Sequence, residues 1–222
     1  MCGRFYLDVK KKKLAEHFHI TDIADIPDLP PRFNIAPSQE IAVVRQSEKG
    51  REVTMMRWGL LPSWSEDSKA KFSMINGRAE TVAEKPAYRA AFKKRRCLIP
   101  ASGFYEWKPS ATGKQPYVIR RKDDGMLALA GIWEHWEGGD EIIESCSIIV
   151  TAANTLMAPL HDRMPVILTP DNYSEWLRSE TQSTDHLQGM LLPYPLDDLE
   201  TYPVSKRVNK PDNDGSDLIV RS

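Results

Sequence analysis

The sequence predicts a single α+β domain, residues 1–222, in which short helices flank a central, mostly antiparallel β-sheet. Three observations lead to this prediction. A chain of 222 residues suits one domain better than two. Segments with strand character dominate the middle of the chain, and the segments with helical character are short and few. No linker, internal repeat or low-complexity block separates them.

Three segments have helical character. Residues 8–19 suit a short amphipathic helix, because apolar side chains recur on one side of it. Residues 84–95 suit a second helix, which ends in a basic cluster. Residues 170–178 suit a third, since proline is favoured in the first turn of a helix. In contrast, residues 26–37 contain four prolines and are expected to form an extended loop.

The expected strands are short runs rich in β-branched and aromatic residues, bounded by charged residues, glycine or proline. The first two are expected to pair as a hairpin. The strands are residues 40–45, 52–58, 97–100, 104–108, 117–121, 127–133 and 146–151.

The composition is that of an ordinary soluble globular protein, with 41% hydrophobic and 27% charged residues. No apolar run approaches the roughly 20 residues that a membrane-spanning helix needs. The N-terminal segment lacks the apolar stretch of a secretory signal, because four lysines are followed by a mixed sequence. We therefore expect an intracellular protein without a membrane partner.

The cysteines and histidines predict no metal site. Cys2, Cys97 and Cys146 form no CxxC pair and no zinc-like spacing. His17 and His19 are two residues apart and would face different sides of a helix. Cys97 and Cys146 lie in apolar runs and are expected to be buried.

Charge is distributed unevenly along a chain whose formal net charge is −1. Residues 71–121 contain twelve Lys and Arg side chains against three acids, whereas residues 171–201 contain seven acids against one arginine. A solvated basic face is the ordinary explanation. A basic segment on a near-neutral protein is also typical of a local nucleic-acid groove.

Cys2 has the most distinctive chemistry in the chain. Removal of the initiator Met1 would make Cys2 the N-terminal residue and leave an amine and a thiol on adjacent carbons. Such an amine, with a reference pKa of about 7.7–8.0, is substantially unprotonated at neutral pH. It can attack an aldehyde to form a Schiff base, and the thiol can then close a thiazolidine ring. A chance cysteine in a frayed terminus is the alternative.

Several other polar residues lie at the ends of expected elements, where functional residues often occur. Taken alone, each has an ordinary explanation. Asn76 begins an Asn-Gly turn dipeptide. Glu106 could pair with a surface lysine, and His161 could lie in a loop. The tryptophans in these stretches are more often core residues than platforms for nucleic-acid bases.

Six motifs follow one another from residue 2 to about residue 170, with a weaker echo at residues 203–205. They are Met-Cys-Gly-Arg, Arg-Phe-Asn-Ile-Ala-Pro, Trp-Gly-Leu-Leu-Pro-Ser-Trp, Ile-Asn-Gly-Arg-Ala-Glu-Thr, Gly-Phe-Tyr-Glu-Trp and His-Asp-Arg-Met-Pro. Together these motifs resemble the SRAP (SOS response-associated peptidase) family, proteins that cross-link to abasic sites in single-stranded DNA. The resemblance implies the SRAP-like fold with its barrel-like core, completed by a closing segment at residues 171–222.

The resemblance also implies roles for individual residues. Cys2 would supply the amine of the Schiff base and the thiol of the thiazolidine. Glu106 and His161 would move protons, which works best with groups tuned toward neutral pH. Asn76 would orient the cysteine or the sugar. Residues implied to bind DNA are the phosphate-contacting Arg4, Arg78 and Arg163, the stacking Trp64 and Trp107, and the site-lining Pro37 and Thr151.

The expected function is covalent capture of abasic sites in single-stranded DNA by a monomer that needs no cofactor. AP-lyase activity, reversal of the cross-link and self-processing are further activities that the family raises. The expected compartment is the cytoplasm for a bacterial source and the nucleus for a eukaryotic one. Two alternatives remain: an N-terminal-nucleophile cysteine hydrolase or peptidase, and a single-strand binder in which Cys2 is spare.

Overall fold

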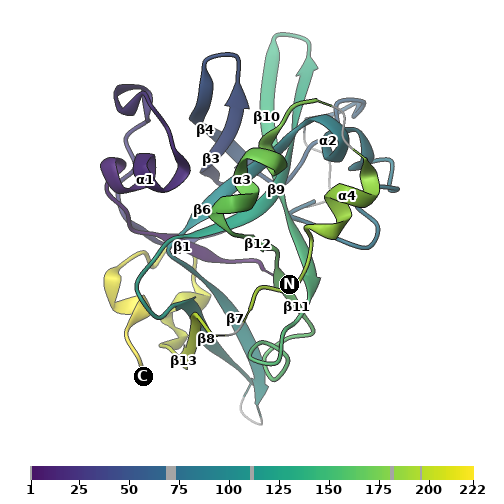
Figure 1. Cartoon of the computed structure of the whole chain (residues 1–222). Coiled ribbons are helices and arrows are strands. Elements are labelled where there is room, and N and C mark those ends of the chain that lie inside the picture. The colour runs from purple at the N-terminus through teal and green to yellow at the C-terminus, as the bar shows by residue number, and fades with distance from the viewer. Residues whose placement is uncertain (1, 69–73, 111–112, 181–182, 196) are drawn as a thin grey trace.

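The predicted α+β class is confirmed by the computed structural model, which describes residues 2–68, 74–110, 113–180, 183–195 and 197–222 (Figure 1). Strands build two sheets, and short helices lie on their outside. The helices are α1 (Lys11–Phe18), α2 (Arg89–Lys94), α3 (Pro170–Leu177) and α4 (Thr184–Gly189), with 3-10 turns η1 (Ile23–Asp25), η2 (Lys206–Asn209) and η3 (Ser216–Ile219).

Five long strands close into a barrel, as the expected barrel-like core implies. In ring order they are β4 (Gly50–Trp58), β3 (Glu40–Ser47), β6 (Arg96–Ala101), β9 (Leu127–Gly138) and β10 (Glu141–Ala152). Neighbours along this order pair antiparallel. The ring closes where β10 pairs in parallel with β4, so the sheet is mostly antiparallel, as predicted.

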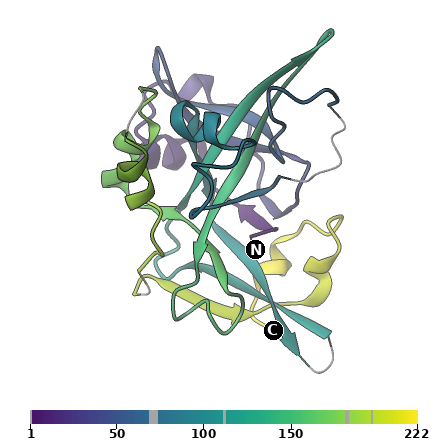
Figure 2. The ribbon, with the colours of Figure 1, turned by 90° about the vertical axis from the view of Figure 1, so that its right-hand side faces the viewer.

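Three short strands extend the barrel sheet. β5 (Asn76–Arg78) pairs in parallel with β10, and β11 (Arg163–Pro165) pairs antiparallel with the same strand. β12 (Ile167–Leu168) pairs with β9. The hairpin of β9 and β10 extends to the upper right of Figure 2.

A second, five-stranded antiparallel sheet holds the N-terminus. Its order is β13 (Leu199–Pro203), β8 (Gly113–Arg121), β7 (Gly103–Ser110), β1 (Phe5–Leu7) and β2 (Arg32–Ile35). Phe5 on β1 pairs with Phe104 on β7. The residues before β1 therefore run beside β7, close to the C-terminal segment that Figure 2 shows in yellow.

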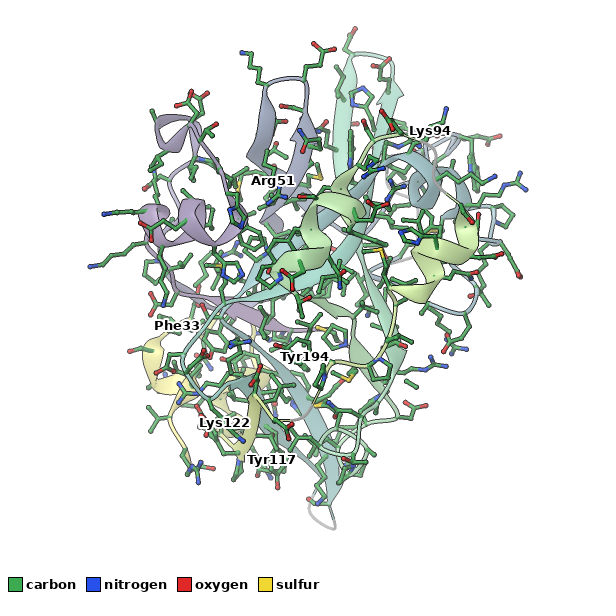
Figure 3. The ribbon with its side chains drawn as sticks, in the orientation of Figure 1. Phe33, Arg51, Lys94, Tyr117, Lys122 and Tyr194 are labelled. Carbon is green, nitrogen blue, oxygen red and sulfur yellow. The ribbon has the colours of Figure 1, made fainter. Side chains whose placement is uncertain are left out.

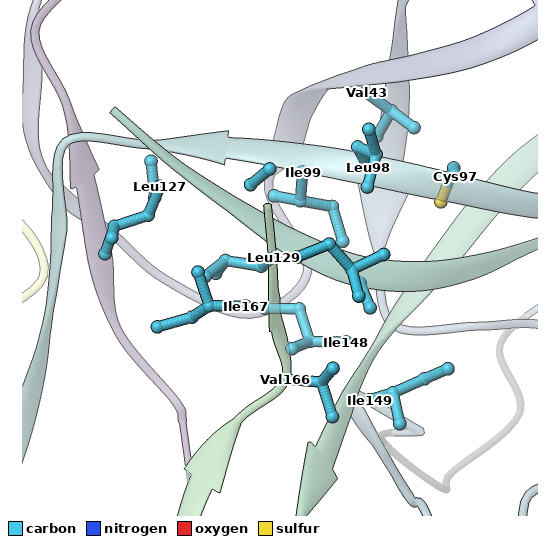
Figure 4. Close-up of a cluster of buried hydrophobic side chains, with 14 of the residues drawn as sticks. Val43, Cys97, Leu98, Ile99, Leu127, Leu129, Ile148, Ile149, Val166 and Ile167 are labelled. Atoms are coloured by element: carbon cyan, nitrogen blue, oxygen red, sulfur yellow. The ribbon is translucent and has the colours of Figure 1, made fainter. Parts of the chain in front are cut away.

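A core of buried apolar side chains covers both faces of the barrel strands, and Figure 4 shows a part of it made mainly of Val, Ile and Leu. Val43, Leu98, Leu129 and Ile148 are fully buried. A side chain at Gly131 would bring its Cβ to 2.6 Å from Ile99 Cδ1, so only glycine fits that position without a shift. The predicted burial of the two internal cysteines is confirmed, and both are free thiols.

The helix predictions are confirmed at 8–19 and 170–178, where α1 and α3 form. The prediction for 84–95 is correct only for its last part. Residues before α2 form successive turns, in which Lys85 N–H bonds to Thr81 O and Tyr88 N–H bonds to Lys85 O. Pro86 explains this, because proline disfavours the helical conformation in the residue before it. Among the described residues, no helix is long and apolar enough to cross a membrane.

Two loop predictions were wrong. Part of the proline-rich segment forms β2, which pairs with β1. The Asn-Gly dipeptide at 76–77 belongs to strand β5 rather than to a turn. A Cβ at its glycine would lie 3.3 Å from Val82 Cγ2, so Val82 would have to shift by a few tenths of an ångström.

Candidate functional site

Cys2 lies at the junction of the two sheets with its side chain only 1% exposed. Its position follows from β1, because Tyr105 N–H on β7 donates to Arg4 O and holds the N-terminal segment beside β7. Burial, followed by the negative charge of Glu106, raises the pKa of the Cys2 thiol well above its ordinary value. The thiol is therefore neutral at physiological pH.

Asn76 fixes the backbone of Cys2. Its Nδ2 donates to Cys2 O over 2.9 Å, and its own backbone O accepts from Tyr88 OH at 3.2 Å. Asn76 Oδ1 is buried and has no hydrogen-bond partner within the described part of the chain. A buried acceptor without a partner costs stability, which points to a donor that arrives with the substrate or with the processed terminus.

Glu106 and His161 line one pocket of about 530 Å³. Glu106 lies on β7 and is 4% exposed. Burial raises the pKa of its carboxyl group. A hydrogen bond with the terminal amine of the chain and the charge of that amine oppose the shift most, followed by His161 and the backbone N–H of Trp107. A carboxyl group of this kind exchanges protons closer to neutral pH than an exposed one does.

His161 is oriented by its own loop. Its Nδ1 accepts from the backbone N–H of Arg163 at 3.0 Å and lies 2.7 Å from Asp162 Oδ1. In the neutral ring, acceptance at Nδ1 leaves the proton on Nε2. In the protonated ring, Nδ1–H can turn to the carboxylate. The two contacts at Nδ1 thus hold the ring in place.

The Arg4 side chain is held by hydrogen bonds within the protein, unlike an arginine that is free at the surface to contact phosphate. Its Nη1 donates to Asn34 Oδ1 at 2.6 Å and to Val208 O at 2.9 Å. Its guanidinium carbon lies 5.9 Å from the centre of the Trp107 ring. Arg4 Nε is buried without a hydrogen-bond partner among the described residues, so one strong donor remains for an anion.

Two further arginines flank β10. Arg78 on β5 pairs with Val150, and Arg163 on β11 pairs with Ala152. Glu80 contacts Arg163, with 2.5 Å between Oε1 and Nη1. Partial burial acts to raise the pKa of Glu80, but its hydrogen bonds and the two arginines outweigh this and lower it. The ionised carboxylate of Glu80 therefore pairs with Arg163 in the protein without DNA.

The comparison with known proteins identifies the family. The model of the family described as SOS response associated peptidase (SRAP) matches residues 1–211. The chain belongs to the SRAP family. Abasic site processing protein YoqW of Bacillus subtilis is 42% identical over 223 residues, covering 99% of both chains. Abasic site processing protein YedK of Escherichia coli is 30% identical over 228 residues, again with 99% of each.

More distant similarities agree with this assignment. Abasic site processing protein HMCES of Xenopus tropicalis is 34% identical over 195 residues, which cover 77% of this chain and 57% of that protein. A solved structure of a Bacteroides thetaiotaomicron protein is 25% identical, with a TM-score of 0.87 and full coverage of both chains. The fold described above is thus that of the SRAP domain.

Not every SRAP motif residue lies at the pocket. Arg4, Glu106, Trp107 and His161 line it, and Cys2 and Asn76 are linked to it through the contacts above. The other predicted residues are not among those that line it: Arg78 and Arg163 beside β10, Trp64 at 65% exposure, the half-buried Pro37, and Thr151, which is buried on β10.

Three residues at the site were missed from the sequence. Lys114 and Asn209 line the pocket. Asn34 is 2% exposed and holds both Arg4 and the C-terminal segment. Asn34 stands inside the Arg-Phe-Asn-Ile-Ala-Pro motif, which was the available signal. For the other two the sequence offered none, since each is one polar residue in a polar stretch.

The described residues include no group of three or more His, Cys, Asp or Glu side chains that could hold a metal ion. The groups around the pocket are instead suited to proton transfer and anion binding. A buried carboxyl, an oriented imidazole and a partly satisfied guanidinium line this pocket, and Cys2 is linked to it through Asn76 and Glu106.

Proposed function

We propose that the protein processes abasic sites in DNA by capturing them covalently through Cys2 once Met1 has been removed. The carrying observation is the position of Cys2, between the Asn76 amide that holds its backbone and the buried Glu106 whose carboxyl pKa is raised. The names of the relatives, which describe abasic site processing proteins, support a role in processing this DNA lesion.

The chemistry balances with no other reactant. The Cys2 amine attacks the aldehyde carbon of the ring-opened deoxyribose, and a C–N bond forms. Glu106 accepts the proton that the amine loses and returns one to the hydroxyl, which leaves as water. The thiol then adds its sulfur to the imine carbon and its proton to the imine nitrogen, which closes the thiazolidine. The product is protein plus DNA minus one water.

The raised pKa of the thiol favours this order of events. A neutral, buried thiol is a poor first nucleophile, because the thiolate is the reactive form. In this proposal the amine therefore reacts first, and the thiol adds afterwards to the imine.

DNA contacts complete the proposal. A guanidinium grips phosphate in two-point fashion, and an aromatic ring stacks on any base. An abasic nucleotide has no base to read, so binding to single-stranded DNA tolerates any sequence. We assign these contacts to Arg4, Arg78, Arg163, Trp64, Trp107, Pro37 and Thr151. The Schiff base also offers a route to strand cleavage by β-elimination and to reversal.

Intact-mass spectrometry with an oligonucleotide that carries one abasic site tests the proposal. We expect an adduct of the des-Met1 protein plus DNA minus one water. Cys2→Ser keeps a small second residue and an N-terminal amine but lacks the thiol. Its adduct should survive only after borohydride reduction of the imine.

Absence of any adduct from protein with a free Cys2 amine would refute covalent capture. Turnover of peptide substrates would then support the hydrolase. Reversible DNA binding that is unchanged in Cys2→Ala would instead support a simple single-strand binder.

A further inference from the structure

The indole of Trp107 is held rigidly at the rim of the pocket. Its Nε1 donates to Asn209 Oδ1 at 2.7 Å, and Asn209 ends the 3-10 turn η2. The Arg4 guanidinium lies on another side of the ring, and Tyr105 contacts it with ring centres 6.5 Å apart. The Trp107 ring is half-buried, so part of it is open to solvent. A fixed, partly open aromatic ring is a stacking platform for a base.

Lys114 lies on the same face of the β7–β8 hairpin as Trp107. It pairs with Pro109, two residues after Trp107, and residues two apart in a strand share a face. Diagonal neighbours of this kind are about 7–8 Å apart. Lys114 is exposed and lines the pocket together with Glu106. Lys108 follows Trp107 directly and so lies on the other face of the strand, which it shares with Glu106, but it is not among the residues that line the pocket.

Lys114 differs from the nearby arginines in its partners. Arg4 is bonded to Asn34 and Val208, and Arg163 is paired with Glu80. Within the described ranges no acidic side chain is close enough to Lys114 for an ion pair. A phosphate can therefore bind this ammonium group without displacing a carboxylate.

We propose that one flank of the DNA strand leaves the reaction pocket along the β7–β8 hairpin, where Lys114 binds the phosphate of the nucleotide whose base stacks on Trp107. This inference rests on the proposed function. The arginines beside β10 belong to a different edge of the site, so they serve the other flank. Lys114 is thus a binding residue for only one side of the lesion.

Two oligonucleotides test this path. One carries the abasic site near its 5′ end and the other near its 3′ end, so that each has a long flank on one side only. Cross-linking is measured at DNA concentrations below saturation for the wild type, Lys114→Ala, Lys114→Arg and Lys108→Ala. Binding of an undamaged single strand is measured separately by fluorescence anisotropy over a range of salt concentrations.

We expect Lys114→Ala to slow capture severalfold with one of the two oligonucleotides and to leave the other unchanged. Its binding to undamaged DNA should weaken, and the slope of log K against log salt should fall by about 0.7, the contribution of one phosphate contact on a single strand. Lys114→Arg should restore both. Lys108→Ala, an equal change of charge on the opposite face, should match the wild type.

The proposed path would be refuted if Lys114→Ala and Lys108→Ala slowed cross-linking equally, or if Lys114→Ala slowed it equally with both oligonucleotides. Either outcome would indicate only a general effect of charge. An unchanged Lys114→Ala would also overturn the path and would leave covalent capture intact. If the wild type cross-links neither oligonucleotide, the proposed function fails, and the anisotropy measurement alone decides whether Lys114 binds DNA.

Discussion

Replacement of Asn34 should destabilise the C-terminal segment beside the site and leave the barrel strands protected. The Asn34 side chain has four hydrogen-bond contacts, because Oδ1 accepts one bond and the two N–H groups of Nδ2 are shared among three backbone oxygens. Oδ1 accepts from Arg4 Nη1 at 2.6 Å. Nδ2 lies 3.2, 2.9 and 2.7 Å from the backbone oxygens of Val208, Lys210 and Asn213. One amide thus holds both Arg4 and the segment that carries Asn209.

The cost of Asn34→Ala follows from these bonds. The bond to a charged guanidinium contributes about 1.5–3 kcal/mol. The carbonyls of Lys210 and Asn213 belong to the C-terminal segment near the surface, where water can replace the lost donor, so each adds about 0.5–1 kcal/mol at most. We expect a loss of about 3 kcal/mol in the free energy of unfolding. For a chain of this length that corresponds to a fall of roughly 6–12 °C in Tm.

Urea unfolding followed by tryptophan fluorescence measures the loss, and hydrogen exchange locates it. Backbone amides in residues 206–214 should exchange faster, while those of the barrel strands stay protected. Asn172→Ala is the matched control, because Asn172 is exposed and makes one weak bond of 3.4 Å to Thr169. It should change stability by less than about 0.5 kcal/mol. A loss below about 1 kcal/mol for Asn34→Ala would refute the reasoning.

Two glutamates give further predictions. Because burial raises the pKa of Glu106, the folded protein binds its proton more tightly than the unfolded chain, and stability falls as pH rises from about 4.3 through the raised value. Glu106→Gln should therefore be more stable than the wild type at pH 7–8, equal to it below about pH 4, and slower in cross-linking by about 100-fold or more. Glu80→Gln releases Arg163 and should bind single-stranded DNA severalfold more tightly, measured by anisotropy at low salt.

Each glutamate has a control of equal charge change. Glu48→Gln lies in an exposed turn far along the chain from Glu106, and its stability difference from the wild type should not track pH in the same way. A Glu106→Gln protein that is less stable than the wild type at neutral pH would contradict the argument from burial. Glu84→Gln is exposed in the turns that follow Glu80. If it tightens DNA binding as much as Glu80→Gln does, net charge rather than release of an arginine is responsible.

The long barrel strands could be predicted from sequence because each contains a run of buried apolar residues, as residues 97–99 of β6 and 148–150 of β10 show. The three-residue strands β1 and β5 could not, since a run so short has no period. They exist only because β7 and β10 offer open edges for pairing. The Asn-Gly turn was predicted from a local preference that tertiary packing overrides, with Gly77 pressed against Val82.

The motifs picked out candidate site residues, but not the partners that these residues have in the structure. Arg4 and Arg163 were expected to face phosphate, and in the free protein they bind Asn34 and Glu80. The contact between Asn34 and Val208 spans 174 residues. A sequence pattern describes neighbours along the chain, so it carries no information on a hydrogen bond between a side-chain amide and a backbone oxygen at that separation.

The site lies where the two sheets meet, and that placement explains its chemistry. Asn76 is on β5 and His161 lies just before β11, both attached to the barrel through β10. Glu106 is on β7 in the second sheet. Cys2 lies between them. Its backbone O accepts a hydrogen bond from Asn76, and the charge of Glu106 acts on its thiol. The N-terminal residue can be placed this way only if β1 is paired between β7 and β2. Strands of the second sheet therefore position Cys2 and Glu106, and strands of the barrel position Asn76 and His161.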